Sequence, residues 1–115
     1  MTRETIKLIT TGRHSKIRRE ATLYAFPDGD RLVVVGSGGG AAKDPAWALN
    51  LRAEPRAEVR RGRATQGVIA SEAESAERER LWTIVTQTSR FYAGFQKRTK
   101  RTIPVFVLMP VAGDG

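Results

Sequence analysis

Alternating apolar and polar positions predict three β-strands in the first third of the chain. Residues 5–11 alternate with a period of two, which is typical of a half-buried strand. A second strand is predicted over residues 21–26, and it ends at the turn signal PDGD (27–30). Residues 31–35, RLVVV, are nearly all apolar and β-branched, as expected of a central strand buried on both faces. A hairpin should therefore join the second and third strands.

Two later segments have the patterns of helices. Asp44 followed by Pro45 is a good helix start, because the carboxylate can accept free N–H groups of the first turn and proline fits the first helical position. This helix should end near Ala53 and bury Trp47 on its apolar face. A longer amphipathic helix is predicted over residues 75–88, with its charged positions forming surface pairs.

The remaining pattern completes a mainly β chain. Residues 56–61 and 64–70 predict another hairpin, and residues 103–110 predict the last strand, after an aromatic segment over 89–95 and before an irregular tail. The order of elements lacks the βαβα alternation of a doubly wound sheet. We therefore expect an α+β, mainly β barrel with a short and a longer helix packed at its edge, formed as one domain by residues 1–115.

Composition excludes several kinds of chemistry. The 115 residues include no cysteine and one histidine, so the chain cannot form a disulfide, a thiolate zinc site, a cysteine nucleophile or a histidine-rich metal cluster. We predict no metal site. No apolar run has the length of a signal peptide or of a membrane span, so we expect a cytoplasmic protein.

The formal net charge of +8 favours an anionic partner, which can be a nucleic acid, an acidic lipid or a polyanionic cofactor. Basic segments at 13–19 and 97–101, the second of them close to aromatic residues, make a nucleic-acid-binding module the alternative from a different class. The charge is scattered over several elements and no known nucleic-acid motif is present. We therefore expect no nucleic-acid partner.

The loop after the third predicted strand has features of an anion site. Ser37, Gly38 and Gly39 leave the backbone accessible, Lys43 adds a cation, and a predicted helix begins just beyond. The glycines match neither the Rossmann fingerprint nor a Walker loop, which disfavours nucleoside triphosphates. A flexible surface loop remains the alternative interpretation.

A second group of donors lies at the end of the first predicted strand. Arg13, His14, Ser15 and Arg19 bring two guanidinium groups, an imidazole and a hydroxyl close together in the sequence, which suits an anionic ligand. We interpret His14 as an anion-binding donor in preference to an acid or base. Both groups of donors should meet across neighbouring strands in a single pocket.

Four stretches of the sequence resemble one known family. They are TTGRHS (10–15), the segment 26–59, ERERLW (77–82) and RTIPVFVLMP (101–110). The most specific part is the pattern K-x-P-x-W-x-x-N-L-x-A-x-P over residues 43–55. The chain resembles the deazaflavin-dependent nitroreductase and quinone reductase family over nearly its whole length.

That resemblance implies a split β-barrel related to flavin-mononucleotide-binding barrels. It also implies an oxidoreductase in which reduced coenzyme F-420, a deazaflavin, gives a hydride to a quinone, a nitroaromatic compound or another electron-poor acceptor. Alternatives that keep the barrel are binding of flavin mononucleotide (FMN), haem or a fatty acid. Monomer and homodimer both stay open.

The resemblance also assigns residues. Arg13, His14, Ser15 and Arg19 would hold the phosphate and acidic tail of the cofactor, and Tyr92 and Ser37 would act on the substrate as hydrogen-bond donors. At three positions the chain departs from the family: Gly38 and His14 replace lysines, and Phe95 replaces a tyrosine. The other predicted cofactor-binding residues are Thr22, Leu23, Tyr24, Val35, Gly36, Ser37, Gly38, Gly39, Lys43, Ala46, Trp47 and Asn50, and the predicted substrate-binding residues are Phe91, Tyr92 and Phe95.

Overall fold

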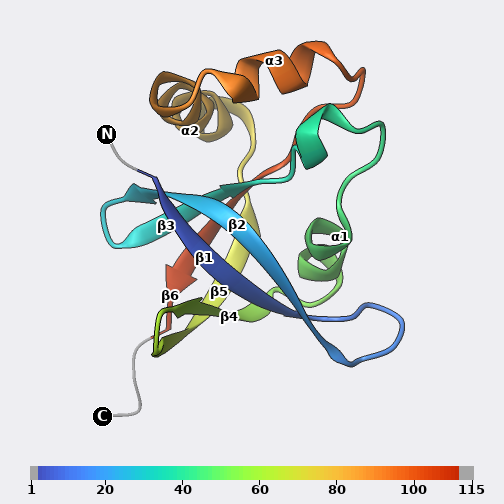
Figure 1. The fold of residues 1–115 in the computed structure, drawn as a ribbon, viewed down its shortest axis with the longest axis vertical. Coiled ribbons are helices and arrows are strands. Elements are labelled where there is room, and N and C mark those ends of the chain that lie inside the picture. The colour runs from blue at the N-terminus through green and yellow to red at the C-terminus, as the bar shows by residue number, and fades with distance from the viewer. Residues whose placement is uncertain (1–2, 112–115) are drawn as a thin grey trace.

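Six antiparallel strands form a closed barrel, and three α-helices pack around it (Figure 1). The computed structural model describes residues 3–111. Around the barrel the strand order is β1-β2-β3-β6-β5-β4. The elements are β1 (Glu4–Thr11), β2 (Arg18–Asp28), β3 (Arg31–Val35), a 3-10 turn η1 (Gly38–Gly40), α1 (Ala46–Ala53), β4 (Arg56–Arg61), β5 (Ala64–Glu72), α2 (Ser75–Thr88), α3 (Phe91–Lys97) and β6 (Val105–Pro110).

Although each strand of the barrel has two neighbours, the barrel is open along the first part of β2. This strand pairs with β1 from Arg18 to Ala25, but it pairs with β3 only from Phe26 to Asp28. Within the described residues, the first part of β2 therefore has a strand on one side only. Helix α1 lies along the opening (Figure 1). An open strand edge exposes backbone N–H and C=O groups that a ligand can reach.

Strand β3 contributes to two separate apolar cores. Leu32 and Val34 point into the barrel, where they join a cluster that also includes Trp47 of α1. Val33 and Val35 point outward into a second cluster, which α2 and α3 cover. Alternate residues of a strand face opposite sides, so a strand covered on both sides must be apolar throughout. The prediction that residues 31–35 form a strand buried on both faces is confirmed.

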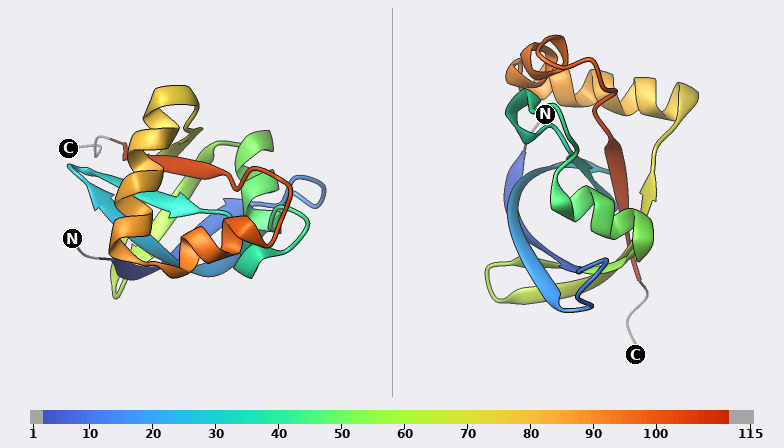
Figure 2. Two further views of the ribbon diagram at one scale, coloured as in Figure 1. Left: turned by 90° about the horizontal axis from the view of Figure 1, so that it is seen from above. Right: turned by 90° about the vertical axis from the view of Figure 1, so that its right-hand side faces the viewer.

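Helices α2 and α3 pack over one end of the barrel, at the top of Figure 1, and the right-hand view of Figure 2 shows α2 running away from α3 along that end. On α2, Leu81 and Val85 are buried as predicted, whereas Ala76 is exposed. In the described part of the chain, no helix is long and apolar enough to cross a membrane.

The fold class, the hairpin of β4 and β5 and the bounds of α2 agree with the prediction, although β5 continues two residues past the predicted end at Ala70. The predicted start of α1 was wrong, and α3 was not predicted. Helix α1 begins at Ala46, and Asp44 does not cap it, because the Asp44 carboxylate accepts hydrogen bonds from Arg52 and Arg101. Helix α3 begins within the predicted aromatic segment (89–95) and continues to Lys97, and its Tyr92 and Phe95, three residues apart, turn their rings toward the barrel.

Strand ends also differ from the prediction. β2 starts three residues earlier and continues through Pro27 and Asp28, so the turn is shorter than expected and Gly29 alone takes a positive φ of 65°. β6 starts at Val105 and not at Ile103, because the Ile103 N–H donates to the side chain of Gln96 (3.0 Å). Of the predicted tail, residues 112–115 lie outside the described part.

Candidate cofactor-binding groove

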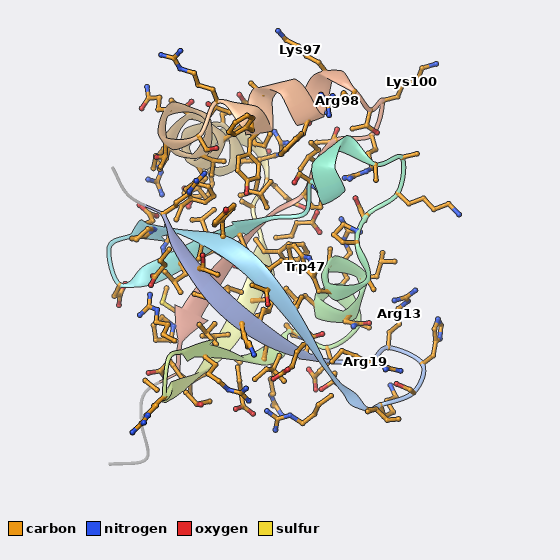
Figure 3. The ribbon with its side chains drawn as sticks, viewed as in Figure 1. Arg13, Arg19, Trp47, Lys97, Arg98 and Lys100 are labelled. Carbon is orange, nitrogen blue, oxygen red and sulfur yellow. The ribbon has the colours of Figure 1, made fainter. Side chains whose placement is uncertain are left out.

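A groove of about 490 Å³ lies at the split of the barrel. The β1–β2 turn, the start of β2 and the first two turns of α1 form its walls. Figure 3 shows Arg13 and Arg19 at the turn end of this region and Trp47 beside α1. The lining residues are Thr10, Gly12, Arg13, His14, Ser15, Arg19, Glu20, Ala21, Ala46, Trp47 and Asn50.

The side chain of Asn50 fixes the β1–β2 turn against α1. Its Oδ1 accepts hydrogen bonds from the backbone N–H of Arg13 (3.1 Å) and from Nη1 of the same residue (3.3 Å). Its Nδ2 donates to Thr10 Oγ1 (3.1 Å). Asn50 is 3% exposed and Thr10 is 2% exposed, so these bonds form away from water, where a lost partner is costly. Asn50 thereby determines where the Arg13 guanidinium lies.

Gly12 allows the turn to close tightly. Its N–H donates to the Ile17 carbonyl (2.8 Å), and its carbonyl accepts from the Lys16 N–H (2.9 Å). A Cβ at this position would lie 2.5 Å from Ser15 Oγ and 3.1 Å from the Ile17 oxygen. The sequence Gly-Arg-His-Ser therefore makes a compact turn that brings Arg13, His14 and Ser15 to the rim of the groove.

Unlike several other arginines of the barrel, the two arginines of the groove make no ion pair with any described residue. In the part of the chain that the structure describes, neither Arg13 nor Arg19 has a carboxylate within ion-pair distance. On the neighbouring strands Arg18 pairs with Glu58, and Arg60 pairs with Glu20 at 2.9 Å. Arg19 therefore keeps all its guanidinium donors and Arg13 keeps all but the one that Asn50 accepts, and such groups bind phosphate and carboxylate well.

The glycine loop is held by Arg101 from the far end of the chain. The guanidinium donates to the carbonyls of Ser37 and Ala41 (2.9 Å each) and to the Asp44 carboxylate (2.7 Å). Gly38, Gly39 and Gly40 all have positive φ, between 53° and 88°. At Gly40 a Cβ would also lie 3.0 Å from the Phe95 carbonyl oxygen, so the loop fits closely against α3.

Tyr92 and Tyr24 belong to a second cluster, next to the other end of β2. Tyr92 packs edge-on against Phe26 and Phe95, with ring centroids 5.5 Å apart in each case. Burial raises the pKa of the Tyr92 hydroxyl, while the nearby charge of Arg3 opposes that rise. The Arg3 guanidinium lies 4.3 Å from the centre of the exposed Tyr24 ring. Tyr92 therefore keeps its proton at neutral pH and can act as a donor.

The structure brings one part of the predicted site together in the groove. Arg13, His14, Ser15, Arg19, Ala46, Trp47 and Asn50 all line it. The glycine loop does not line it, but this loop leads directly into α1, on the same side of the barrel as the groove (Figure 1). The predicted residues that lie outside the groove are Thr22, Leu23, Tyr24, Val35, Gly36, Ser37, Gly38, Gly39, Lys43, Phe91, Tyr92 and Phe95.

The predicted residues outside the groove differ in how far they are buried. Val35 belongs to the core under α2 and α3, and Ser37, two residues further along the chain, is also buried. Gly36 packs against Pro104, whose Cγ would lie 2.8 Å from a Cβ at that position. Thr22, Tyr24 and Phe91 are exposed, and Leu23 is half-buried against the inner core. Trp47 lines the groove and also belongs to the barrel core.

Several contributors were not predicted from the sequence. Thr10, Glu20 and Ala21 line the groove through their places in β1 and β2, and Gly12 lines it from the turn between these strands. Arg101 was assigned to a basic segment for nucleic acid, whereas its guanidinium holds the glycine loop. No local signal points to this role, because Arg101 lies 64 residues from Ser37 in the sequence.

The six strands thus form a small split barrel with a groove lined by Arg13, Arg19 and Trp47. The family described as F420H(2)-dependent quinone reductase matches residues 1–110 of the chain. An F420H(2)-dependent quinone reductase of Mycobacterium tuberculosis is 38% identical over 104 residues, which cover 88% of this chain and 70% of the relative.

Two solved structures have the same fold. One, described as an F420-H2 dependent reductase, superposes with a TM-score of 0.82 at 32% identity and covers 90% of this chain and 92% of that chain. Another, described as a domain-swapped dimer, has the same TM-score and identity and covers 90% of this chain and 78% of that chain. The chain belongs to the F420H(2)-dependent quinone reductase family, and its fold is the split β-barrel. The family's description names an oxidoreductase activity that depends on reduced coenzyme F-420.

Proposed function

We propose that this protein is a quinone reductase that binds reduced coenzyme F-420 along the open edge of β2. The acidic part of the cofactor would lie in the groove, against Arg13 and Arg19. The deazaflavin ring would lie further along β2, toward Tyr24 and the glycine loop. When bound, the reduced deazaflavin supplies the hydride that an electron-poor acceptor takes up.

The observation that supports this proposal most is the pair of groove arginines without carboxylate partners. A coenzyme with a phosphodiester and several carboxylates gains most from guanidinium groups whose donors are free. The groove volume of about 490 Å³ lies within the range of about 300 to 1,000 Å³ of small-molecule sites. From Arg19 to Tyr24 the strand covers roughly 17 Å at 3.3 Å per residue, a length suited to an extended ligand.

The protein's own groups would position the reactants and provide one proton donor. Tyr92 is protonated at neutral pH, since the ordinary pKa of tyrosine is about 10 and burial raises it further, so its hydroxyl can donate to an oxygen of the acceptor on which negative charge develops. Ser37 would be a second donor near the end of β3. Phe91 and Phe95 would flank the acceptor, and the remaining residues would orient the cofactor and exclude water. Nitroaromatic compounds are further candidate acceptors.

The decisive experiment is a titration of the purified protein with oxidised coenzyme F-420, FMN and haem, followed by a quinone-reduction assay with the reduced deazaflavin. We expect the deazaflavin to bind more tightly than FMN or haem, and quinone to be consumed only when reduced deazaflavin is present. Tight binding of FMN or haem, without binding of the deazaflavin, would contradict the proposal. The described residues include no cluster suited to a metal ion, so no metal is added.

A homodimer is a second candidate feature. One structural neighbour is described as a domain-swapped dimer, and the split beside β2 leaves a strand edge that a second chain could meet. Light scattering at several protein concentrations tests this assignment directly. A mass of one chain at every concentration would exclude the dimer.

A further inference from the structure

We propose that the exposed residues of α3 and of the segment after it form a docking surface for anionic lipid bilayers. This surface consists of Phe91, Lys97, Arg98 and Lys100, together with Arg90 just before the helix, and it is called the α3 face below. The stem of Arg98 also packs against the glycine loop, where its Cβ would lie 3.0 Å from a Cβ at Gly40. All five residues are exposed. Figure 3 shows Lys97 and Lys100 extending away from the barrel at the end of the molecule that α2 and α3 cover. Peripheral docking of this kind needs no membrane-spanning helix.

The charge of the α3 face is not neutralised by the protein. From Arg80 to Gly113 the sequence contains no Asp or Glu. Within the described residues, the four cations of the α3 face make no ion pair, whereas on the barrel Arg18, Arg60 and Arg61 all pair with glutamates. The acidic residues of α2 lie in its first half, which starts at the end far from α3 (Figure 2). The α3 face is therefore a local concentration of positive charge.

An exposed aromatic ring lies within this charged surface. Phe91 is 71% exposed, the highest value among the exposed large hydrophobic residues. A helical surface with cations and one exposed apolar ring is typical of contact with a lipid interface, where the ring enters the headgroup layer and the cations bind acidic headgroups. Single-stranded nucleic acid favours a charged groove with several stacking rings, and the α3 face has one exposed ring. Lipid therefore fits this surface better than nucleic acid.

Docking at the α3 face would bring the proposed site close to the bilayer. This step alone rests on the proposed function. Phe91 is the neighbour of Tyr92, the proposed donor to the acceptor. A quinone with an apolar chain partitions into lipid, because transfer of apolar surface out of water is favourable. A bilayer held against α3 would concentrate such acceptors next to the end of β2 where reduction is proposed.

The test is co-sedimentation with lipid vesicles, measured without cofactor or quinone, so its result is independent of the proposed enzyme activity. One vesicle type is pure phosphatidylcholine, and the other contains phosphatidylglycerol and phosphatidylcholine at about one to three, in salt of about 0.15 M. We expect binding to the anionic vesicles only. Higher salt should weaken it, because salt screens exposed charges.

Two matched triple variants locate the surface. Lys97→Gln, Arg98→Gln and Lys100→Gln together should weaken vesicle binding by about a hundredfold, at roughly fivefold per cation. The control triple, Lys7→Gln, Arg56→Gln and Arg63→Gln, removes the same charge from exposed barrel positions and should stay within a few-fold of the wild type. Equal weakening by both triples would overturn the proposal, as would equal binding of the wild type to both vesicle types.

A third variant tests the apolar part of the contact. Phe91→Ser keeps every charge, and we expect it to weaken binding to the anionic vesicles by about fivefold, because the ring no longer enters the headgroup layer. Binding equal to that of the wild type would overturn the proposal. So would tighter binding of the wild-type protein to a duplex oligonucleotide than to the anionic vesicles at the same salt concentration.

Discussion

The β1–β2 turn and the glycine loop are both glycine-containing connections, but they use positive charge in opposite ways. In the turn, Gly12 and Ile17 close the backbone on itself, and Arg13 is positioned by Asn50 at the groove without a carboxylate partner. In the glycine loop the cation is Arg101, and its donors are occupied by the carbonyls of the loop and by Asp44. One connection offers charge to a ligand, and the other uses charge to hold its own shape.

This difference distinguishes two roles that look alike in the sequence. A glycine-rich loop followed by lysine suggests an anion site. The Arg101 guanidinium next to this loop, however, already donates hydrogen bonds to three acceptors of the protein. The turn has fewer glycines and keeps the free guanidinium groups. We therefore assign the acidic part of a ligand to the turn and the shaping of the neighbouring wall to the loop. Four predictions test this assignment, beginning with the largest expected effect.

Removing the charge of the turn should have the largest effect on binding. Replacing Arg13 and Arg19 by alanine should weaken binding of coenzyme F-420 by about 1.5 to 3 kcal/mol for each lost charged hydrogen bond. Fluorescence titration measures this change. Arg63→Ala, which removes an exposed cation elsewhere on the barrel, is the control and should bind as the wild type does. Equal affinity of the double variant and the control for coenzyme F-420 would show that the turn is not part of the binding site.

Removing the brace of the turn should lower stability as well as binding. Asn50→Ala leaves Thr10 Oγ1 and the Arg13 N–H without their partners, and we expect a loss of about 2 to 3 kcal/mol in the free energy of unfolding. Urea unfolding measures it. Thr10→Val, which removes one of these bonds and keeps the shape of the side chain, should cost less. A stability of Asn50→Ala within about 0.5 kcal/mol of the wild type would show that the brace contributes little.

Removing the cation of the glycine loop should act mainly on the loop itself. Arg101→Ala takes away three charge-assisted hydrogen bonds from a half-buried position, and we expect a loss of about 2 kcal/mol together with faster amide exchange at Gly38–Ala41. Arg101→Lys keeps the charge but cannot reach three acceptors, so it should rescue stability only in part. Arg60→Ala, which breaks an exposed ion pair, should cost less than about 1 kcal/mol.

Ion pairs far from both connections should contribute least, and their contribution should depend on pH. Hydrogen bonds from Arg80 and Arg31 lower the pKa of Asp28 to about 2. A pKa that is lower in the folded state adds stability above the unfolded value, and that stability is lost as pH falls toward 2. Asp28→Asn should therefore cost about 1 kcal/mol at neutral pH, and its unfolding free energy should approach that of the wild type near pH 2. An equal difference at both pH values would contradict this origin.

Most of the barrel could be predicted from the sequence, because its strands have local patterns. The alternation in residues 5–11 and the apolar run over residues 32–35 indicate directly which faces are buried. The start of α1 could not be predicted, since Asp44 has ion-pair partners at positions 52 and 101 that no local pattern reveals. Helix α3 was missed because Gly94 weakens the helical signal of a short segment.

The groove was predictable to the extent that its residues follow one another in the sequence. Arg13, His14 and Ser15 share one turn, so a local reading already brings them together. Their meeting with Trp47 and Asn50 was inferred through a family resemblance, and the structure brings these residues to the same groove. Arg101 was missed because its partners lie about 60 residues away. Long-range hydrogen bonds of this kind depend on the completed fold, which local patterns do not encode.

The place of β6 between β3 and β5 also has a consequence for biosynthesis. Until this last strand leaves the ribosome, both neighbouring strands keep an open edge, and Arg101, which precedes it, cannot yet hold the glycine loop. Closure of the barrel therefore waits until Val105–Pro110 has been synthesised, because β6 makes contacts that are distant in the sequence. A nascent chain stalled before Thr102 would be a substrate for chaperones and would carry no formed barrel.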